Sequence, residues 1–290
     1  MKNKILIMAL FTILLVSSLL PNAAAASTSF LMNTKKNYTY TVYEQKNKHN
    51  RSSMTATFTG KINDSDLWFY RFAGDFFQQL YLQDDYGLES ASNTELKFPL
   101  VKGAEWKKGN ATARIISLNN TVKTPAGTFS NCVLVETVYN AANKDLAYYA
   151  PGHGLIKLQS GSGATVEVSK IENAHYGRVL IKEKGIAMYN PQGKVHRILT
   201  KGEGLKVFKE NVSSYDVGGG YYVKKSKATL FYTGFVYSKK QQLDIYAPNG
   251  KLHRKTRVGE TIRVYGFKNG DYQVGGGYYI SADNHVQYDR

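Results

Sequence analysis

The sequence has very little cysteine: Cys132 is the only one among 290 residues. A single thiol cannot close an internal disulfide, and it leaves no cysteine cluster for a zinc site or an iron–sulfur cluster. Because Cys132 lies in a strand-like stretch, 129–138, we expect it to be a small buried apolar residue and not a catalytic nucleophile. The fold must therefore be stabilised by burial of the apolar residues that make up 42% of the chain.

Acidic residues are also scarce, with 22 Asp and Glu against 38 Lys and Arg, and the formal net charge is +16. The charge does not indicate a disordered chain, because 13% of the residues are aromatic and only 21% are charged. The composition also excludes a collagen-like chain and a coiled coil. It predicts a folded, basic protein.

Long apolar runs are missing except at the start of the chain. Lys2 and Lys4 precede an almost unbroken apolar run, 5–20, which is followed by the small residues 23–26. This is the pattern of a secretory signal peptide, and we expect cleavage near Ala26. No cysteine lies directly after the run, so there is no site for lipoprotein acylation, and no later stretch is apolar enough to span a bilayer. The sequence therefore predicts a secreted protein without an integral membrane segment after cleavage.

The positive charge is concentrated in the C-terminal part, since residues 27–176 carry a net charge of +3 and residues 177–290 carry +11. An internal repeat begins at the same boundary. At a constant shift of 57 residues, 185–223 aligns with 242–280, and 16 of the 39 positions are identical. The predicted organisation is a signal peptide at 1–26, a sheet domain at 27–176, and two modules at 177–235 and 236–290.

Each copy of the repeat has the pattern of short strands separated by turns. Pro and Gly in 189–193 and 246–250 predict tight hairpins, and 201–203 predicts a further turn. Three consecutive glycines then precede the strand-like stretch 221–223. The start of that strand must tolerate a positive φ or a close approach of the backbone. A unit of this size is typical of a small barrel.

The motifs GKxxR, GExxxV and YxVGGGYY, which both copies share, resemble the SH3-like and surface-layer-type repeats that bacteria append to exported proteins. The resemblance implies non-covalent attachment to peptidoglycan or to a teichoic-acid-like polyanion, and a location in the cell wall or the extracellular space. The charge supports this independently, because +11 over 114 residues creates a sizeable positive potential. The alternative is that the basic residues only keep the modules soluble.

Basic and aromatic residues recur at equivalent places in both copies, and we predict that they bind the wall polymer. The candidates are Lys194, His196, Arg197 and Tyr222 in the first copy and Lys251, His253, Arg254 and Tyr279 in the second. Tyr221 and Tyr278 are predicted to be structural, since neighbours in a strand face opposite ways. One His per copy gives too few metal ligands, so we expect no metal and no other cofactor. Export argues against nucleic acid as a partner.

In the part before the repeats, larger residues alternate with small polar ones, as is typical of β-strands. The short strands, which are separated by Gly, Asn and Asp, predict one large antiparallel sheet that can curl into a half-barrel. The expected strands are 38–43, 54–59, 67–72, 76–82, 112–118, 131–139, 146–149, 155–158 and 165–171. A helix at 76–86 is the alternative. The predicted fold class is thus mainly β, with this antiparallel sheet followed by two small SH3-like β-barrel modules.

The stretches FPLVKGAEWKKG, TVKTPAGTFSNCVLVE and YYAPGHGLIK resemble a sheet domain of exported Gram-positive proteins. The resemblance implies a hairpin at 124–129 and a turn at 148–154. The resemblance implies the topology of the domain and its export from the cell, but it implies no biochemical activity. His153 in that turn is expected to be an exposed turn residue and not a catalytic group.

No catalytic constellation is present in the sequence. The Ser-x-x-Lys, Gly-x-Ser-x-Gly, His-Glu-x-x-His and Gly-x-x-x-x-Gly-Lys motifs are all missing. The pairs Asp64 with Asp66 and Asp84 with Asp85 are expected in solvated loops. We therefore expect a protein that is not an enzyme and has no catalytic residues.

Two other functions stay open. Wall hydrolases often carry repeats of this type, so an atypical cell-wall hydrolase is one alternative. A half-barrel carrier of an apolar ligand is the other. The aromatic residues expected to line its cavity are Phe69, Phe72, Phe76, Phe77 and Tyr81.

Overall fold

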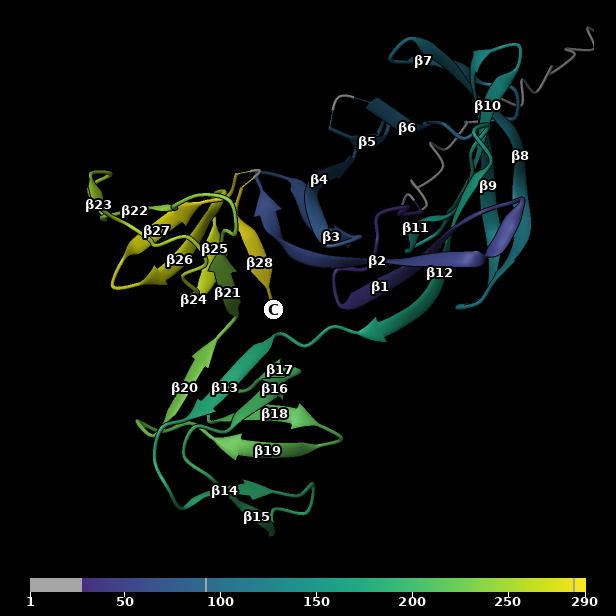
Figure 1. Cartoon of the computed structure of the whole chain (residues 1–290). Helices are drawn as coiled ribbons and strands as arrows, with labels where there is room; N and C mark the ends of the chain where they lie inside the picture. Colours follow the sequence, from purple (N-terminus) through teal and green to yellow (C-terminus); the bar gives the residue numbers. More distant parts are fainter. Residues whose placement is uncertain (1–27, 92, 284) are drawn as a thin grey trace, which may run out of the picture.

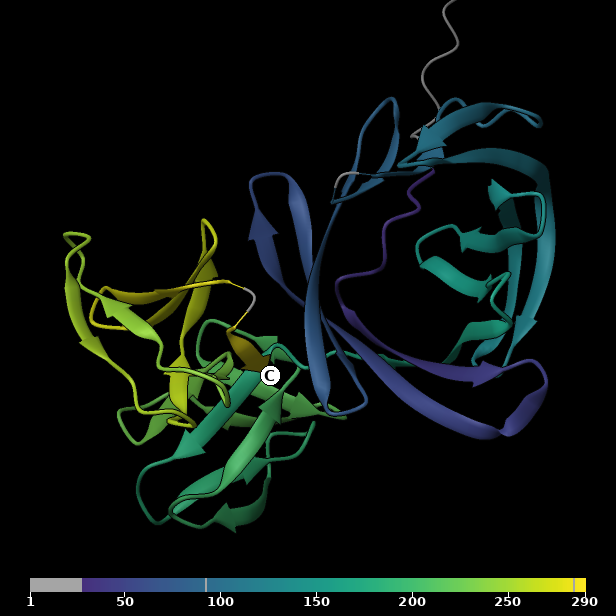
Figure 2. The ribbon, with the colours of Figure 1, turned by 45° about the horizontal axis from the view of Figure 1, so that its top comes forward.

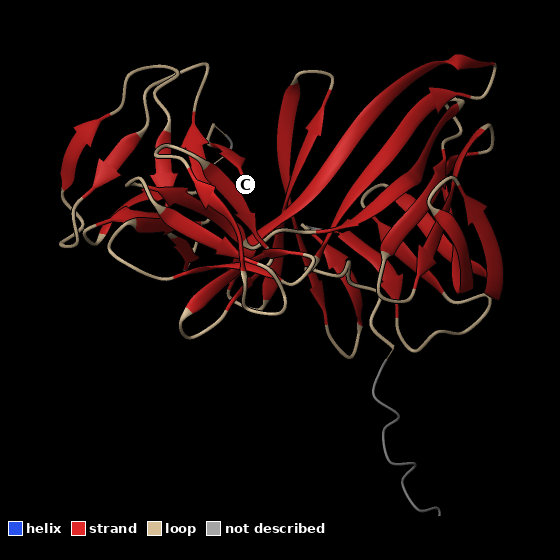
Figure 3. Ribbon diagram, turned by 90° about the horizontal axis from the view of Figure 1, so that it is seen from below, coloured by secondary structure: helices blue, strands red, loops and turns tan. Residues whose placement is uncertain are grey.

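The computed structural model describes residues 28–91, 93–283 and 285–290, and every helix or strand in these ranges is a β-strand (Figure 3). The mainly β fold class is therefore confirmed. The described ranges contain no helix of the length and apolarity that a membrane span needs. The predicted signal peptide, 1–26, lies outside the described residues.

The N-terminal part is one antiparallel sheet of twelve strands that curls into a near-closed barrel (Figure 1, Figure 2). Its strands are β1 Lys36–Glu44, β2 Asn47–Ile62, β3 Ser65–Phe72, β4 Asp75–Gln83, β5 Gly87–Ser90, β6 Asn93–Lys97, β7 Glu105–Lys108, β8 Ala111–Thr124, β9 Gly127–Asn140, β10 Asn143–Ala150, β11 Gly154–Gln159 and β12 Ala164–Asn173. Their order in the sheet is β6-β5-β4-β3-β2-β1-β12-β11-β10-β9-β8-β7. Most neighbours are therefore joined by hairpins, and the β1–β12 pair joins the two halves.

All nine expected strands are present, and so are the predicted hairpin between β8 and β9 and the turn between β10 and β11. Alternation made these strands predictable: in β1, Tyr38 and Tyr40 are buried and the threonines between and after them are half-buried. The alternative of a helix at 76–86 is wrong, because most of that stretch is strand β4. The three short strands β5, β6 and β7 were not predicted.

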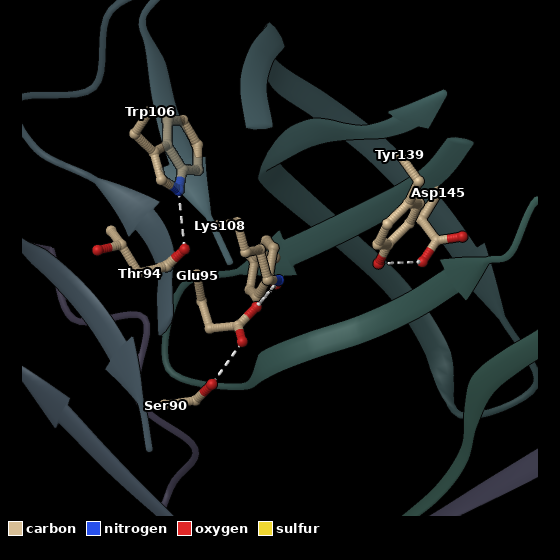
Figure 4. Close-up of polar contacts among 8 residues, drawn as sticks. Ser90, Thr94, Glu95, Trp106, Lys108, Tyr139 and Asp145 are labelled. Carbon is tan, nitrogen blue, oxygen red and sulfur yellow. Dashed lines mark hydrogen bonds and ion pairs between the residues drawn. The ribbon is translucent and has the colours of Figure 1, made fainter. Parts of the chain in front are cut away.

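Side chains bridge the two edge strands, β6 and β7, so the sheet curls further than a half-barrel (Figure 4). The Trp106 indole donates to the carbonyl oxygen of Thr94 over 2.8 Å, and Lys108 Nζ lies 2.5 Å from Glu95 Oε2. The other donors to Glu95 are Ser90 and Tyr149. Burial raises the pKa of Glu95, but the charge and hydrogen bond of Lys108 and the two hydroxyl donors outweigh it and lower that pKa overall.

The segment that precedes β1 runs through the inside of the barrel (Figure 2). The side chains of Phe30 and Met32 are buried there, with 2% and 6% of their surface exposed. The Phe30 amide donates to Gln83 Oε1 over 2.6 Å, and the Gly152 amide donates to the carbonyl oxygen of Ser29 over 2.7 Å. A cavity of only about 180 Å³ remains beside this segment.

The C-terminal part consists of two modules of the same architecture, each with one three-stranded and one five-stranded antiparallel sheet (Figure 1). The strands of module 1 are β13 Gly177–Ile181, β14 Ile186–Tyr189, β15 Val195–Leu199, β16 Gly204–Val207, β17 Lys209–Glu210, β18 Ser214–Gly218, β19 Tyr221–Lys224 and β20 Thr229–Tyr232. Those of module 2 are β21 Gly234–Tyr237, β22 Asp244–Tyr246, β23 Leu252–Lys255, β24 Ile262–Val264, β25 Gly266–Lys268, β26 Asp271–Gly275, β27 Tyr278–Ser281 and β28 Gln287–Asp289.

The two modules have matching strand orders, β16-β13-β20 with β15-β14-β19-β18-β17 in module 1, and β24-β21-β28 with β23-β22-β27-β26-β25 in module 2. Equivalent strands are separated by about the 57 residues of the sequence repeat. The duplication seen in the sequence is therefore a duplication of structure.

Module 2 packs against the outside of the barrel. Phe69 of β3 is 2% exposed and belongs to the same apolar cluster as the core of module 2, and Phe76 of β4 packs against that cluster. Arg71 Nη2 donates to the carbonyl oxygen of Tyr288 over 2.6 Å, and Gln78 donates to two further carbonyl groups of module 2. Module 2 is thus docked on the barrel, and strands β3 and β4 contribute to the cores of both.

Candidate functional site

The three consecutive glycines of each module make room for bulky neighbours. In module 1 their φ angles are 102°, 62° and 78°, all in the region that favours glycine. A Cβ added to Gly218 would lie 3.0 Å from Cε2 of Phe208, and one added to Gly220 would lie 3.0 Å from Cγ of Pro191. The equivalent residues of module 2 are Gly275, Tyr265, Gly277 and Pro248. The motif therefore holds an aromatic ring and a proline-containing turn against the sheet.

After the glycines, the two tyrosines of β19 make different contacts. Tyr222 stacks on Tyr189 of β14, with 5.2 Å between the ring centroids and 14° between the planes. Lys224 Nζ lies 4.8 Å from the centre of the Tyr189 ring. In module 2, Tyr279 stacks on Tyr246 in the same way, at 5.5 Å.

Tyr221 lies against His196 of the neighbouring hairpin, with ring centroids 4.8 Å apart in a T-shaped arrangement. In module 2, His253 and Tyr278 repeat the contact at 4.6 Å. Tyr221 also packs against the apolar core of module 1. The predicted ligand contact His196 therefore lies with Tyr221, whereas Tyr222 lies with Tyr189.

The predicted ligand contacts Arg197 and Arg254 each pair with a glutamate of their own module. Arg254 forms two hydrogen bonds to Glu260, of 2.7 and 3.1 Å, and Arg197 binds Glu203 through both terminal nitrogens. These hydrogen bonds lower the pKa of both glutamates, mainly through the guanidinium donors. The recurrence of Arg and of the GE motif is thus explained by an internal ion pair that fastens the β15 or β23 strand to the following turn.

Lys194 and Lys251 occupy the tight turn before that strand. Both side chains are exposed, and neither has a carboxylate within ion-pair distance among the described residues. The turn of Lys194 lies close to Tyr222, since a Cβ added to Gly193 would be 3.7 Å from the Tyr222 hydroxyl oxygen. The turn that carries Lys194 therefore lies beside the Tyr222 stack.

Tyr189, Tyr246 and Lys224 are the residues of this surface that the sequence analysis missed. The identity of Tyr189 and Tyr246 between the copies was a signal that could have revealed the stack. Lys224 carried no such signal, because Ser281 occupies its position in module 2. A hollow of about 570 Å³ lies beside Tyr222 and Lys224, and one of about 400 Å³ lies beside Tyr246.

The aromatic residues predicted to line a cavity in the sheet are divided between its two faces. Phe77 and Tyr81 line the interior cavity, whereas Phe69 and Phe76 face outward and pack against module 2. Phe72 lies at the end of β3, on the face that alternation gives to Tyr70, but it lines a separate hollow beside Tyr237 of module 2 and not the interior cavity. The prediction was wrong for Phe69 and Phe76 because consecutive residues of a strand point to opposite faces, so Phe76 and Phe77 cannot both point inward.

Three further expectations from the sequence have clear outcomes. Cys132 is fully buried, and burial raises the pKa of its thiol, so the expectation of a buried apolar residue is confirmed. His153 is not an exposed turn residue: it is half-buried, with its ring 5.2 Å from that of Phe129. Asp66 is not in a solvated loop, because it is 3% exposed in β3 and lies 3.3 Å from Lys61 Nζ.

The described residues contain no cluster of three or more His, Cys, Asp or Glu side chains that could hold a metal ion.

No protein-family model and no curated protein matches the chain. An exported protein with a YmcC-like fold from Bacteroides fragilis aligns over 50% of this chain and 99% of its own, with 14% identity and a TM-score of 0.34. A protein described as a lipoprotein from Parabacteroides distasonis gives the same coverage and identity, with a TM-score of 0.30.

The cell-wall-binding domain (CBD) of the endolysin LysPBC5 aligns over 41% of this chain and 97% of its own, with 20% identity and a TM-score of 0.22. At these identities and TM-scores, the three alignments assign neither a family nor a ligand to this chain.

Proposed function

We propose that this is an exported protein without catalytic activity, held at the cell wall by its two basic modules. The single observation that carries the proposal is the duplicated surface: in both modules an exposed lysine turn lies beside a stacked tyrosine pair, on a part of the chain with a net charge of +11. Cations attract a polyanion, and flat aromatic faces offer contact area to sugars. Anionic wall polymers carry both negative charge and sugar rings, and they are the first polyanions that an exported protein encounters.

The proposed ligand contacts include fewer of the residues that were predicted from the sequence. The proposed contacts are Lys194, Lys251 and the tyrosine pairs Tyr189–Tyr222 and Tyr246–Tyr279. Arg197 and Arg254 serve mainly to fasten strands, because their charges are already paired within the module. The arginines are therefore expected to matter for module stability more than for wall binding.

Sedimentation with purified cell walls tests this function on the full-length protein. Truncation to the barrel alone is unsuitable, because it would uncover Phe69 and Phe76. We expect the double variant Lys194→Gln/Lys251→Gln to lose at least about half of its retention. Raising the salt concentration to about 1 M, where the screening length is only about 3 Å, should release the wild type.

The matched control is Lys102→Gln/Lys123→Gln, which removes two exposed lysines from the barrel with the same change in net charge. Equal retention of the two double variants would show that only total charge matters and would contradict the proposed contacts. The hydrolase alternative is tested in the same suspension, where loss of turbidity would support it. We expect the turbidity to stay constant.

A further inference from the structure

A hollow of about 1080 Å³ lies where the barrel, module 1 and module 2 meet, near the C-terminus in Figure 1. We call it the junction hollow. All three parts of the molecule contribute to its lining, which includes Lys35, His175, Phe208, Lys209, Tyr265 and Arg290. Its volume is slightly above the range of typical small-molecule sites, which measure about 300–1,000 Å³.

Positive charge dominates this region. Lys35 and Lys209 are exposed, and neither has a carboxylate within ion-pair distance among the residues that the structure describes. Glu210 is the acidic residue among the lining, and its carboxylate lies 2.6 Å from Lys225 Nζ and is thereby neutralised. The hollow therefore offers unpaired cations to an anion.

Buried polar groups in the lining also have nitrogen atoms without a partner. His175 is 9% exposed, and its Nε2 atom has no hydrogen-bond partner in the described structure. The same holds for Nε of Arg290, whose terminal nitrogens bind the carbonyl groups of Phe58 and His175. A buried nitrogen without a partner is costly, but both atoms have almost no accessible surface, so they are not assigned as ligand contacts.

Aromatic rings complete the lining. Phe208 and Tyr265 occupy equivalent positions in the two modules, each held over the first glycine of its motif, and they are 40% and 38% exposed. Tyr176, at 51% exposed, lines the same hollow. Exposed, positioned rings beside cations provide a face for a sugar ring and charges for its substituent.

We propose that the junction hollow binds an anionic sugar, with the anionic group among Lys35, Lys209 and Arg290 and the sugar ring against Phe208 and Tyr265. The inference rests on the proposed function for the source of the ligand, an anionic wall glycan. The site itself is separate from the tyrosine stacks and lysine turns of the two modules. It exists only when both modules are docked to the barrel.

Isothermal titration of the full-length protein with N-acetylglucosamine 1-phosphate tests the site. We expect saturable binding that weakens at least fivefold in Lys35→Gln/Lys209→Gln. The control Lys102→Gln/Lys123→Gln removes the same charge elsewhere and should bind as the wild type does. Equal weakening in both double variants, or no binding by the wild type, would overturn the proposal.

Two further ligands test separately the contributions of the anionic group and of the sugar ring. Neutral N-acetylglucosamine should bind far more weakly than the phosphate ester, and inorganic phosphate should bind more weakly because it has no ring. If either binds as tightly as the ester, the assignment of an anionic sugar is wrong.

Failure of this site is distinguishable from failure of the proposed function. Lys194→Gln/Lys251→Gln should bind the sugar phosphate normally while its retention on cell walls falls. If that variant instead loses the sugar phosphate, the titrated site is the module surface and not the junction hollow. If cell walls retain Lys194→Gln/Lys251→Gln fully while this variant still binds the sugar phosphate at the junction hollow, the proposed function is wrong and the proposed site is supported.

Discussion

His175 is buried where the barrel meets the modules, and its surroundings oppose a positive charge. Burial, followed by the charges of Arg178, Lys206 and Arg290, lowers its pKa from 6.5 to about 4. In the unfolded chain the imidazole regains its ordinary pKa. Between about pH 6.5 and 4 the unfolded state therefore binds a proton that the folded state does not.

The folded protein should accordingly lose stability as the pH falls through this window, whereas above pH 6.5 His175 contributes no pH dependence. The loss attributable to His175 is at most about 3.5 kcal/mol, since its pKa falls from 6.5 to about 4 and each pKa unit corresponds to about 1.4 kcal/mol. Urea unfolding of the wild type and of His175→Gln at several pH values measures it. Carboxylates also titrate in this range, so the difference between the two proteins is the relevant quantity.

We expect the unfolding free energy of His175→Gln to fall less steeply with acid than that of the wild type. Parallel curves for the two proteins would contradict the assignment of the shift to this side chain.

At the scale of elements, the segment that precedes β1 acts as part of the barrel core although it has no regular structure of its own. Phe30 lies in one apolar cluster with Leu88 and Leu96, and Met32 lies in the other cluster with Tyr40. Gly154 permits this approach, because a Cβ there would lie 2.9 Å from Cγ of Met32. The barrel interior is filled by the chain's own N-terminal residues.

Replacing Phe30 by alanine should lower the free energy of unfolding by about 3 kcal/mol, as is typical when a buried aromatic ring is removed. We expect the enlarged cavity to take up an apolar fluorescent probe more strongly than the cavity of the wild type does. Val212→Ala is the control, because Val212 is 99% exposed. An unchanged midpoint of denaturation in Phe30→Ala would show that the segment does not support the barrel.

The elements differ in how well the sequence predicts them, for physical reasons. Strands such as β1 and β8 contain stretches in which buried residues alternate with more exposed ones, so their existence follows from local pattern. Strands β5, β6 and β7 are four or five residues long. They are stabilised by the side-chain contacts around Glu95 that join the two edges of the sheet. Local pattern carries no information on such a long-range contact.

The residues of the candidate site were likewise predictable only in part. The repeat pointed to Lys194, His196, Arg197 and Tyr222 because they recur, and recurrence reports any constraint on a residue. For Arg197 that constraint is an ion pair, and for His196 it is a ring contact, both internal to the module. The junction hollow could not be predicted, since its lining comes from three parts of the chain whose docking the sequence does not state.

At the scale of the whole molecule, the docking of module 2 decides whether the junction hollow exists. The contact depends on Gly60 of β2, where an added Cβ would lie 2.3 Å from Cδ1 of Phe267. Gly60 does not have a positive φ, so alanine fits the barrel strand itself and the clash falls on the module. Gly60→Ala therefore tests docking without disturbing the fold of either part.

We expect Gly60→Ala to increase the radius of gyration in small-angle scattering and to speed protease cleavage between the barrel and the modules. It should also weaken the binding of N-acetylglucosamine 1-phosphate, because the hollow loses one wall. Gly204→Ala is the control, since its added Cβ would meet only the Tyr232 hydroxyl at 3.9 Å. Adding Phe267→Ala to Gly60→Ala removes the clashing ring and should restore the compact form. Unchanged scattering in Gly60→Ala would mean that the Phe267 ring moves aside and the module remains docked.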